Sequence, residues 1–190
     1  MTAERNEVLP QGYYWQPLSP SGFSIPRPEG WYFRQRRVRA LQESYFISRE
    51  ETSGIGVVQI GSGPMIAPKG KEGFFQTGVS AYFFQRVREQ FGTKPSNVAQ
   101  RRIVNLTGGF ISDGPVERDE KGEYIIYRRY MKKETTEIVN LKSRPLNMYS
   151  ELVACDKNDI LLLVAFETPS ELWAQDKQIA DVMVKNLLFA

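Results

Sequence analysis

The stretch ILLLVAFETPSELWAQDKQIADVMVKNLLF, residues 160–189, decides the fold. Its first seven residues, Ile160 to Phe166, are apolar at every position. Such a run is typical of an interior β-strand, because successive side chains of a strand point to opposite faces and here both faces must be covered. The preceding segment supplies a neighbour: Met148–Asp156 and Asp159–Glu167 flank the polar pair Lys157-Asn158, which predicts an antiparallel hairpin.

The second half of the stretch predicts a helix that covers this sheet. Thr168-Pro169-Ser170-Glu171 combines an N-cap threonine, a proline at the first helical position and a glutamate three residues after the cap. The helix is expected to continue to about Leu188. Its apolar side chains share one stripe, namely Leu172, Ile179, Ala180, Met183, Val184 and Leu187.

A second helix is expected at residues 71–91 as the opposite layer. Phe75, Val79, Tyr82, Phe83 and Val87 would lie on one side of it, whereas Phe74 and Phe84 lie elsewhere on its circumference. Such a helix would be buried on more than one face or capped by another segment. The N-terminal residues 1–20, expected to form an extended arm, are the candidate cover.

Short strands are expected upstream and between these elements. In GFSIPRPEGW, residues 22–31, Phe23 and Ile25 would share one face before Pro26 and Pro28 end the pairing, because proline offers no N–H. A turn at Glu29-Gly30 follows. Further strands are expected at Ser44–Arg49, Gly56–Gly61, Arg102–Thr107 and Tyr124–Met131.

These elements predict an α+β fold, a three-layer α/β/α sandwich. Its central, mostly antiparallel sheet would have about six or seven strands, with two main helices. Residues 21–190 would form a single domain behind the arm. The composition agrees, since 41% of the 190 residues are hydrophobic and 25% are charged.

The net charge, the apolar runs and the first ten residues limit the possible partners and locations of the chain. The net charge of +3 permits nucleic acid or an anionic membrane as a partner without requiring either. The longest apolar run has seven residues, against roughly 20 for a membrane-spanning helix. The first ten residues include acidic side chains and no apolar signal core, which favours a cytoplasmic location, or export if a leader precedes the printed start.

The chain contains no histidine, which excludes Ser-His-Asp and Cys-His catalysis, histidine bases and histidine metal ligands. Cys155 is the sole cysteine, so it can form no intrachain disulfide, and its place in a strand predicts a small buried side chain. Residues 61–70 match neither a nucleophile elbow nor a phosphate-binding loop and predict a connecting loop. The acidic residues 113–123 lack calcium-loop spacing and predict a solvated hairpin tip. No catalytic residue, cofactor or metal ligand is predicted.

One candidate partner-binding surface remains. Arg34, Arg36, Arg37 and Arg39 follow Trp31 closely, and in an extended chain they point to both sides, so the segment should be an exposed edge or loop. Such charges either prevent strand addition by another chain or bind an acidic partner or phosphate. Arg128-Arg129 and Lys132-Lys133 form a weaker second patch.

Asp176 is a possible buried polar site, because it lies within the apolar stripe of the last helix. A buried carboxylate requires a hydrogen-bonding or charged partner. Two interpretations stay open: a structural pair with an arginine of the sheet or a tryptophan N–H, and a functional carboxylate in a pocket.

The order of elements, together with GFSIPRPEGW at 22–31 and LLLVAFETPSELWAQDKQIADVMVKNLLF at 161–189, resembles the PsbP-like superfamily. Its fold is shared by the extrinsic photosystem II protein PsbP and a yeast Ran-binding protein. The resemblance implies an α/β/α sandwich that acts as a non-enzymatic accessory or binding module, with no binding residues carried over.

Three functions therefore remain open. The first is a protein-binding accessory module, whose partner is another protein. The second is an enzyme that uses carboxylates, or a protein that binds a small ligand, and either requires a concave site with perturbed carboxylates. The third is weak nucleic-acid binding, which the modest charge makes unlikely. The oligomeric state is unknown from the sequence.

Overall fold

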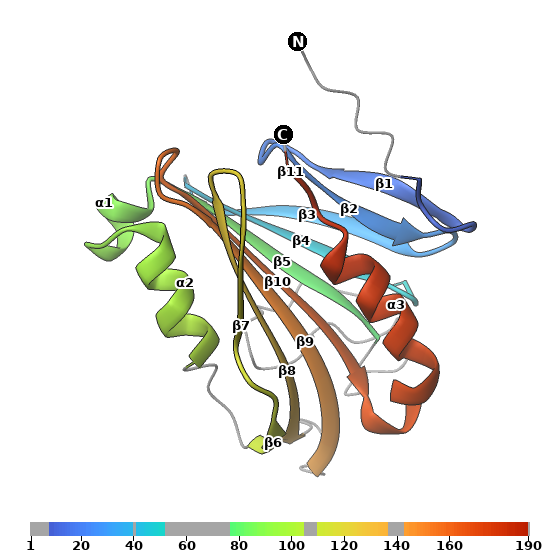
Figure 1. Ribbon diagram of the computed structural model, residues 1–190. Coiled ribbons are helices and arrows are strands. Elements are labelled where there is room, and N and C mark those ends of the chain that lie inside the picture. Colours follow the sequence, from blue (N-terminus) through green and yellow to red (C-terminus); the bar gives the residue numbers. More distant parts are fainter. Residues whose placement is uncertain (1–7, 40, 52–76, 105–109, 137–142, 190) are drawn as a thin grey trace.

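The computed structural model covers the 190-residue chain and describes residues 8–39, 41–51, 77–104, 110–136 and 143–189. Within these ranges the chain forms one large sheet, one small sheet and two main helices, and all paired strands are antiparallel (Figure 1). The large sheet follows the order β3 (Tyr32–Arg39), β4 (Gln42–Ser48), β5 (Gly78–Gln85), β10 (Ile160–Pro169), β9 (Ser143–Cys155), β8 (Tyr124–Thr136) and β6 (Phe110–Asp113), and β7 (Glu117–Lys121) pairs with β8 beside this path.

Strand β10 is the interior strand expected at residues 160–166. It pairs with β5 on one side and with β9 on the other. Its side chains alternate between two apolar cores, one beneath each main helix, α2 (Pro95–Val104) and α3 (Trp173–Lys185). Leu161, Leu163 and Ala165 enter the α2 core, and Leu162, Val164 and Phe166 enter the α3 core, each at most 6% exposed.

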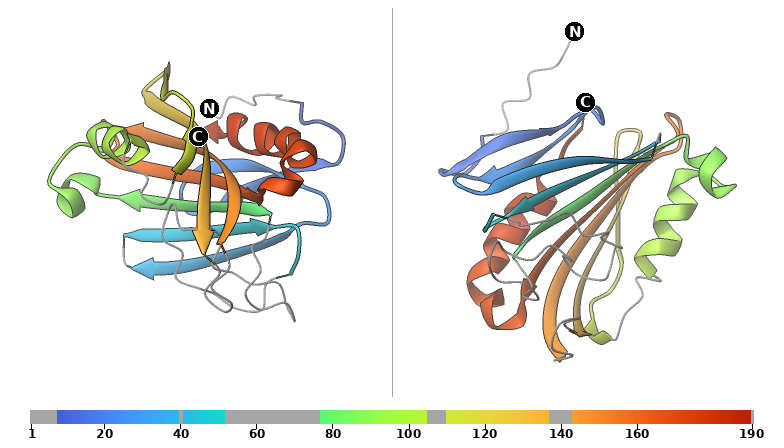
Figure 2. Two further views of the ribbon diagram at one scale, coloured as in Figure 1. Left: turned by 90° about the horizontal axis from the view of Figure 1, so that it is seen from below. Right: turned by 180° about the vertical axis from the view of Figure 1, so that it is seen from behind.

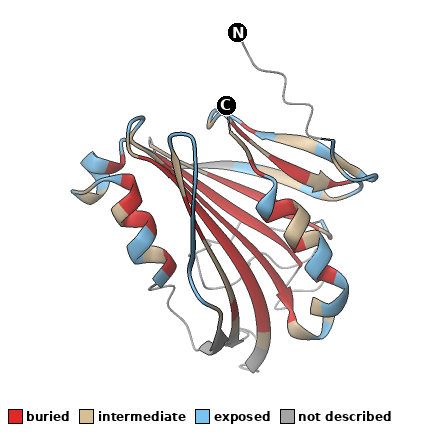
Figure 3. Cartoon of the chain, viewed as in Figure 1, coloured by how far each residue is buried: buried red, intermediate tan, exposed pale blue. Residues whose placement is uncertain are grey.

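The two helices therefore cover opposite faces of the sheet, as Figures 1 and 2 show. The short helix α1 (Val87–Phe91) precedes α2, and the 3-10 turn η1 (Ser170–Leu172) precedes α3. Burial is concentrated in the central strands and on the inner sides of the helices (Figure 3). The predicted three-layer α+β architecture is confirmed. The residues that the helices bury are Val98, Ala99 and Ile103 in α2, and Ala180, Met183 and Val184 in α3.

A small sheet completes the layer on the α3 side. Strand β1 (Tyr13–Leu18) pairs with β2 (Phe23–Pro28), and β11 (Leu188–Phe189) pairs with the start of β2. Leu18, Phe23 and Ile25 insert into the same core as α3. Part of the expected N-terminal arm is thus a paired strand, and it covers the α3 side.

The expected helix at residues 71–91 was wrong over residues 78–85, which form β5. Val79, Phe83 and Val87 do have helical spacing, but residues 78–84 are buried at all seven positions. That pattern suits a strand held between β4 and β10 and covered on both faces. Residues 71–76, the expected strand Gly56–Gly61 and the loop 61–70 lie outside the described residues.

The expected strand Arg102–Thr107 was also wrong, because residues 102–104 form the last turn of α2. The β-branched pair Ile103-Val104 favours a strand locally. Helical packing overrides this preference: Val98 and Ile103 are both buried, and Pro95 fits the start of a helix. Residues 105–107 lie outside the described part of the chain.

The last helix is shorter than predicted at both ends. Strand β10 continues to Pro169, and α3 begins at Trp173 without a side-chain cap. Thr168 forms no cap because its hydroxyl binds the carboxylate of Asp176. At the other end α3 stops at Lys185, and Leu188 pairs with β2.

Pro26 and Pro28 do not end β2, contrary to the prediction. They lie opposite Trp15 and Tyr13 in the pairing with β1. Two residues of the same parity direct their backbone nitrogens to the same side of a strand, so both missing N–H groups can lie away from β1. The turn follows at Gly30, whose φ of 79° favours glycine.

Candidate functional site

Asp176 is fully buried at the start of α3 and lies among polar partners from three other segments. Its Oδ2 accepts hydrogen bonds from the hydroxyls of Thr168, at 2.6 Å, and Thr77, at 3.0 Å. Its Oδ1 accepts a hydrogen bond from Nη2 of Arg49, with which it forms an ion pair. The two threonine hydroxyl oxygens lie 2.7 Å apart. Both carboxylate oxygens are therefore satisfied.

The sheet brings these partners together. Arg49 directly follows β4, Thr77 directly precedes β5, and the backbone N–H of Arg49 donates to the carbonyl of Thr77 at 3.1 Å. The guanidinium of Arg49 also lies over the ring of Trp31, 5.5 Å from its centroid. Asp176 thus joins α3 to three strand ends. Its burial and its bonds on both oxygens agree with the interpretation of Asp176 as a structural pair with an arginine next to the sheet.

A second buried carboxylate, Glu151 on β9, was not found from the sequence. It is 1% exposed and pairs with Nε of Arg128, which lies directly opposite on β8. Nη1 of Arg128 lies 3.3 Å from Oδ2 of Asp119 on β7. Burial raises the pKa of Glu151 to about 7, although the nearby Arg128 acts to lower that pKa. The sequence did contain a signal for this site, namely a glutamate inside a predicted strand whose neighbours are buried.

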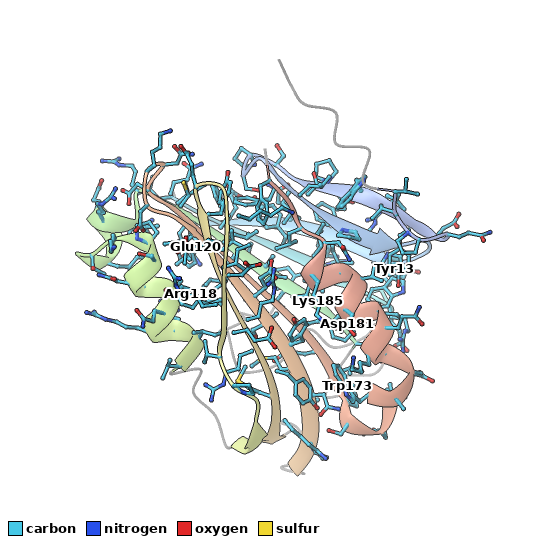
Figure 4. The ribbon with its side chains drawn as sticks, in the orientation of Figure 1. Tyr13, Arg118, Glu120, Trp173, Asp181 and Lys185 are labelled. Atoms are coloured by element: carbon cyan, nitrogen blue, oxygen red, sulfur yellow. The ribbon has the colours of Figure 1, made fainter. Side chains whose placement is uncertain are left out.

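The acidic residues 113–123 belong mostly to the hairpin of β7 and β8. All five residues of β7 are exposed, as expected of a solvated tip. Arg118 and Glu120 form an ion pair with each other on the α2 side of the strand (Figure 4). Within the described ranges no group of three or more acidic or cysteine side chains could hold a metal ion.

The predicted partner-binding residues lie along one edge of the large sheet. Arg34, Arg36, Arg37 and Arg39 are all in β3, which is the first strand of the sheet order. In the part of the chain that the structure describes, β3 pairs with β4 alone. Trp31 stands just before β3, half-buried against the α3 core. The structure thus places the four arginines along a strand that is at the edge of the sheet among the described residues, with Trp31 just before it.

The two arginines of the second basic patch are used within the fold. Arg128 pairs with Glu151 and Asp119. Arg129 donates from Nη1 to the carbonyl oxygens of Ile103 and Val104, at 3.0 and 3.1 Å. These guanidiniums tie β8 to β9, β7 and the end of α2, so they are poor candidates for binding a partner.

Arg27 is a further candidate that the sequence analysis missed. It lies on β2 directly opposite Tyr14 of β1. Its guanidinium carbon lies 4.5 Å from the centroid of the Tyr14 ring and 5.8 Å from that of the Phe33 ring. The alternation that assigns Phe23 and Ile25 to the core also places Arg27 on that face, and this was the signal available in the sequence.

Two other features, a buried cysteine and a stacked pair of aromatic rings, belong to the packing of the fold. Cys155 is buried in β9 as a free thiol. At the start of α3, Trp173 stacks on Tyr130 of β8 with ring centroids 5.1 Å apart, which fixes the helix to the sheet (Figure 4).

No described helix is both long and apolar enough to cross a membrane.

Comparisons with known proteins identify the fold. No family model matches the sequence, and no curated protein matches it. The solution structure of CyanoP, the PsbP of the cyanobacterium Synechocystis sp. PCC 6803, is 10% identical and matches with a TM-score of 0.50 over 97% of this chain and 96% of that chain.

Two further structures are similar. The Ran-binding protein Mog1p of Saccharomyces cerevisiae is 10% identical and has a TM-score of 0.49, over 93% of this chain and 94% of Mog1p. LpqN of Mycobacterium tuberculosis, described as involved in cell envelope biogenesis, is also 10% identical with a TM-score of 0.49, over 92% of this chain and 88% of LpqN. The match to CyanoP shows that the chain has the PsbP-like fold, the fold of the superfamily that its sequence resembles.

Proposed function

We propose that this chain is a non-enzymatic accessory module that binds another protein through the edge of β3. The surface consists of Trp31 and the four arginines at positions 34, 36, 37 and 39. The observation that carries the proposal is that this arginine-rich segment is the first strand of the large sheet and, among the residues that the structure describes, pairs only with β4. An edge offers unpaired backbone donors and acceptors, and its arginines select an acidic partner.

The fold supports this proposal without specifying the partner. The PsbP-like superfamily, which the sequence resembles, contains accessory and binding modules. The carboxylate that an enzyme would most plausibly use, Asp176, is fully buried and bonded on both oxygens. The competing explanation is that the β3 arginines only prevent aggregation, in which case no partner would depend on them.

Affinity capture from a native extract of the source organism, treated with nuclease, tests the proposal. The wild-type protein should retain a specific protein, and Arg34→Glu should reduce its recovery at least about tenfold because it reverses one charge of the surface. Arg101→Glu is the matched control, since Arg101 is an exposed arginine on α2 away from β3. Equal recovery with Arg34→Glu, or no specific protein at all, would reject the proposal.

A nuclease-sensitive complex would instead favour nucleic-acid binding. In that case affinity for a single-stranded or duplex oligonucleotide should fall steeply with salt concentration, because bound cations displace counterions from phosphates. A weak salt response would remove that alternative.

A further inference from the structure

We propose that Arg27 binds a carboxylate group of the protein partner, with its guanidinium held between the rings of Tyr14 and Phe33. This inference rests on the proposed function and names the chemistry that the partner must offer. Phe33 belongs to β3, so the Arg27 site is continuous with the proposed binding edge. The partner would place an aspartate, a glutamate or its own terminal carboxylate against Arg27.

The position of Arg27 in β2 is unusual for an arginine. Phe23, Ile25 and Arg27 share one face of the strand, and the first two are 2% and 0% exposed in the α3 core. Arg27 is half-buried, so it stands where this core meets the surface. A residue used only for solubility would not need to occupy an inward-facing position.

Two aromatic side chains hold the guanidinium in place. Tyr14 lies directly across from Arg27 in the pairing of β1 and β2, and Phe33 approaches from β3. Rings at such distances attract a cation and restrict its rotation, which lowers the entropy lost when a ligand binds. Tyr14 is 37% exposed and Arg27 is only half-buried, so the Nη end of the guanidinium can be reached from solvent although its Nε is buried.

The guanidinium has donor capacity that the described chain does not use. Its Nε is buried and has no hydrogen-bond partner, and no carboxylate pairs with Arg27 among the described residues. Arg49 and Arg128 differ, since each is paired with a buried carboxylate. Burial also lowers the pKa of Arg27, which reflects a charge partly removed from water. The two Nη groups are not among the buried nitrogens and bond to no described residue, so a carboxylate from outside can accept hydrogen bonds from both of them.

The surroundings favour a carboxylate over a polyanion. The planar guanidinium fork matches the two oxygens of a carboxylate. Binding of phosphate chains normally uses several cations at one place. Here one guanidinium lies over the two rings, and Arg34, the nearest arginine of β3 in sequence, alternates to the other face of that strand from Phe33. Aromatic side chains around an arginine are also the composition of protein interfaces.

Nuclear magnetic resonance of the arginine Nε–Hε groups tests the site in the full chain. The probe is an acetylated and amidated tetraglutamate peptide, and the control peptide is tetraglutamine. Tetraglutamate should shift the Arg27 Nε–Hε signal saturably, because a carboxylate bound at the two Nη groups changes the environment of the whole guanidinium, and tetraglutamine should not. Inorganic phosphate forms a second arm and should shift this signal less than the peptide at equal concentration.

Three variants show whether binding depends on the shape of the Arg27 guanidinium and the ring beside it, or only on positive charge. Arg27→Lys keeps the charge but loses the fork, and should weaken tetraglutamate binding at least about tenfold. Tyr14→Leu keeps Arg27 and removes one ring, so binding should weaken about two- to fivefold. Arg101→Lys, on the distant helix α2, should leave binding unchanged. Circular dichroism shows whether each variant is folded.

Absence of a saturable shift, equal binding by Arg27→Lys, or tighter binding of phosphate than of tetraglutamate would overturn the inference. Affinity capture separates this failure from that of the proposed function. If the captured protein depends on Arg34 but not on Arg27, the Arg27 inference alone is wrong. If tetraglutamate binds Arg27 but no protein is captured, the proposed function is wrong and no protein partner supplies the carboxylate, although Arg27 does bind carboxylates.

Discussion

Replacing Asp176 with alanine should strongly destabilise the fold. The substitution removes the acceptor of three hydrogen bonds and leaves Arg49, Thr77 and Thr168 without it. Removing one partner of a buried ion pair typically costs about 3–5 kcal/mol. The Arg49 side chain is 32% exposed and can turn toward water, and the two threonine hydroxyls can bond to each other. We therefore expect a loss of about 3 kcal/mol, toward the lower end of that range.

Such a loss is a large share of the roughly 5–15 kcal/mol that stabilise an ordinary domain. For a chain of this size it should lower the melting temperature by about 6–12 °C. Urea denaturation followed by circular dichroism measures the free energy of unfolding directly. Asp181→Asn is the control on the same helix: its carboxylate pairs at the surface with Lys177 and Lys185, so the expected loss is below about 1 kcal/mol.

A double-mutant cycle with Arg49→Met isolates the ion pair. Asp176→Ala should cost clearly less in the Arg49→Met background than in the wild type, because the guanidinium is no longer left unpaired. If Asp176→Ala costs no more than Asp181→Asn, or if the two substitutions at positions 49 and 176 are additive, the anchoring role assigned to Asp176 is wrong.

Three further predictions concern other parts of the fold. A Cβ at Gly78 would lie 2.5 Å from the carbonyl oxygen of Ile47, so Gly78→Ala should lower the free energy of unfolding by about 1–3 kcal/mol in urea denaturation. Asp156 accepts hydrogen bonds from the backbone N–H and the hydroxyl of Ser96 at 2.8 and 2.7 Å, so Asp156→Ala should loosen the start of α2 and cost about 1–2 kcal/mol, with faster amide exchange there. Burial raises the pKa of Glu151 to about 7, so the folded state favours the neutral carboxyl while the unfolded state releases its proton at lower pH. The stability of the wild type relative to Glu151→Gln should therefore fall by about 2–3 kcal/mol between pH 5 and pH 8.

Controls make these outcomes decisive. Ser80→Ala, two residues along on the same face of β5, keeps an existing Cβ and should cost less than Gly78→Ala. For Asp156, unchanged amide exchange in α2 would contradict the capping role. For Glu151, the folded-state pKa is not raised if the stability of the wild type relative to Glu151→Gln is constant with pH or increases as the pH rises.

Much of the architecture could be predicted because the decisive segments are unambiguous. The run from Ile160 to Phe166 has no polar position, and Ala180, Met183 and Val184 keep helical spacing. Strand β5 was misassigned because Val79 and Phe83 are four residues apart, a spacing that suits a helix face equally well. Its distinguishing property, burial at every position between two neighbours, depends on contacts with residues far away in the sequence.

The candidate sites, too, could be predicted where local sequence decides and not where distant contacts decide. Asp176 could be singled out because its neighbours on the helix are apolar, but its partners Thr77 and Arg49 could not, since they come from distant strand ends. The pairing of Glu151 with Arg128 required the register of β8 against β9. Arg27 could have been suspected from alternation along β2, whereas its approach to Phe33 depends on how the two sheets pack.

The order of strands in the large sheet has a consequence for folding. Strands β3, β4 and β5 are neighbours in the sheet, and so are β8, β9 and β10, whereas β5 and β10 meet although some 80 residues separate them (Figure 1). Strands β3 and β4, and strands β8, β9 and β10, can form from local hairpins. Pairing β4 with β5 requires closing the loop of residues 49–77, and joining β5 to β10 requires closing a longer one. We expect that seam to be formed last, so substitutions along it should speed unfolding more than they slow refolding.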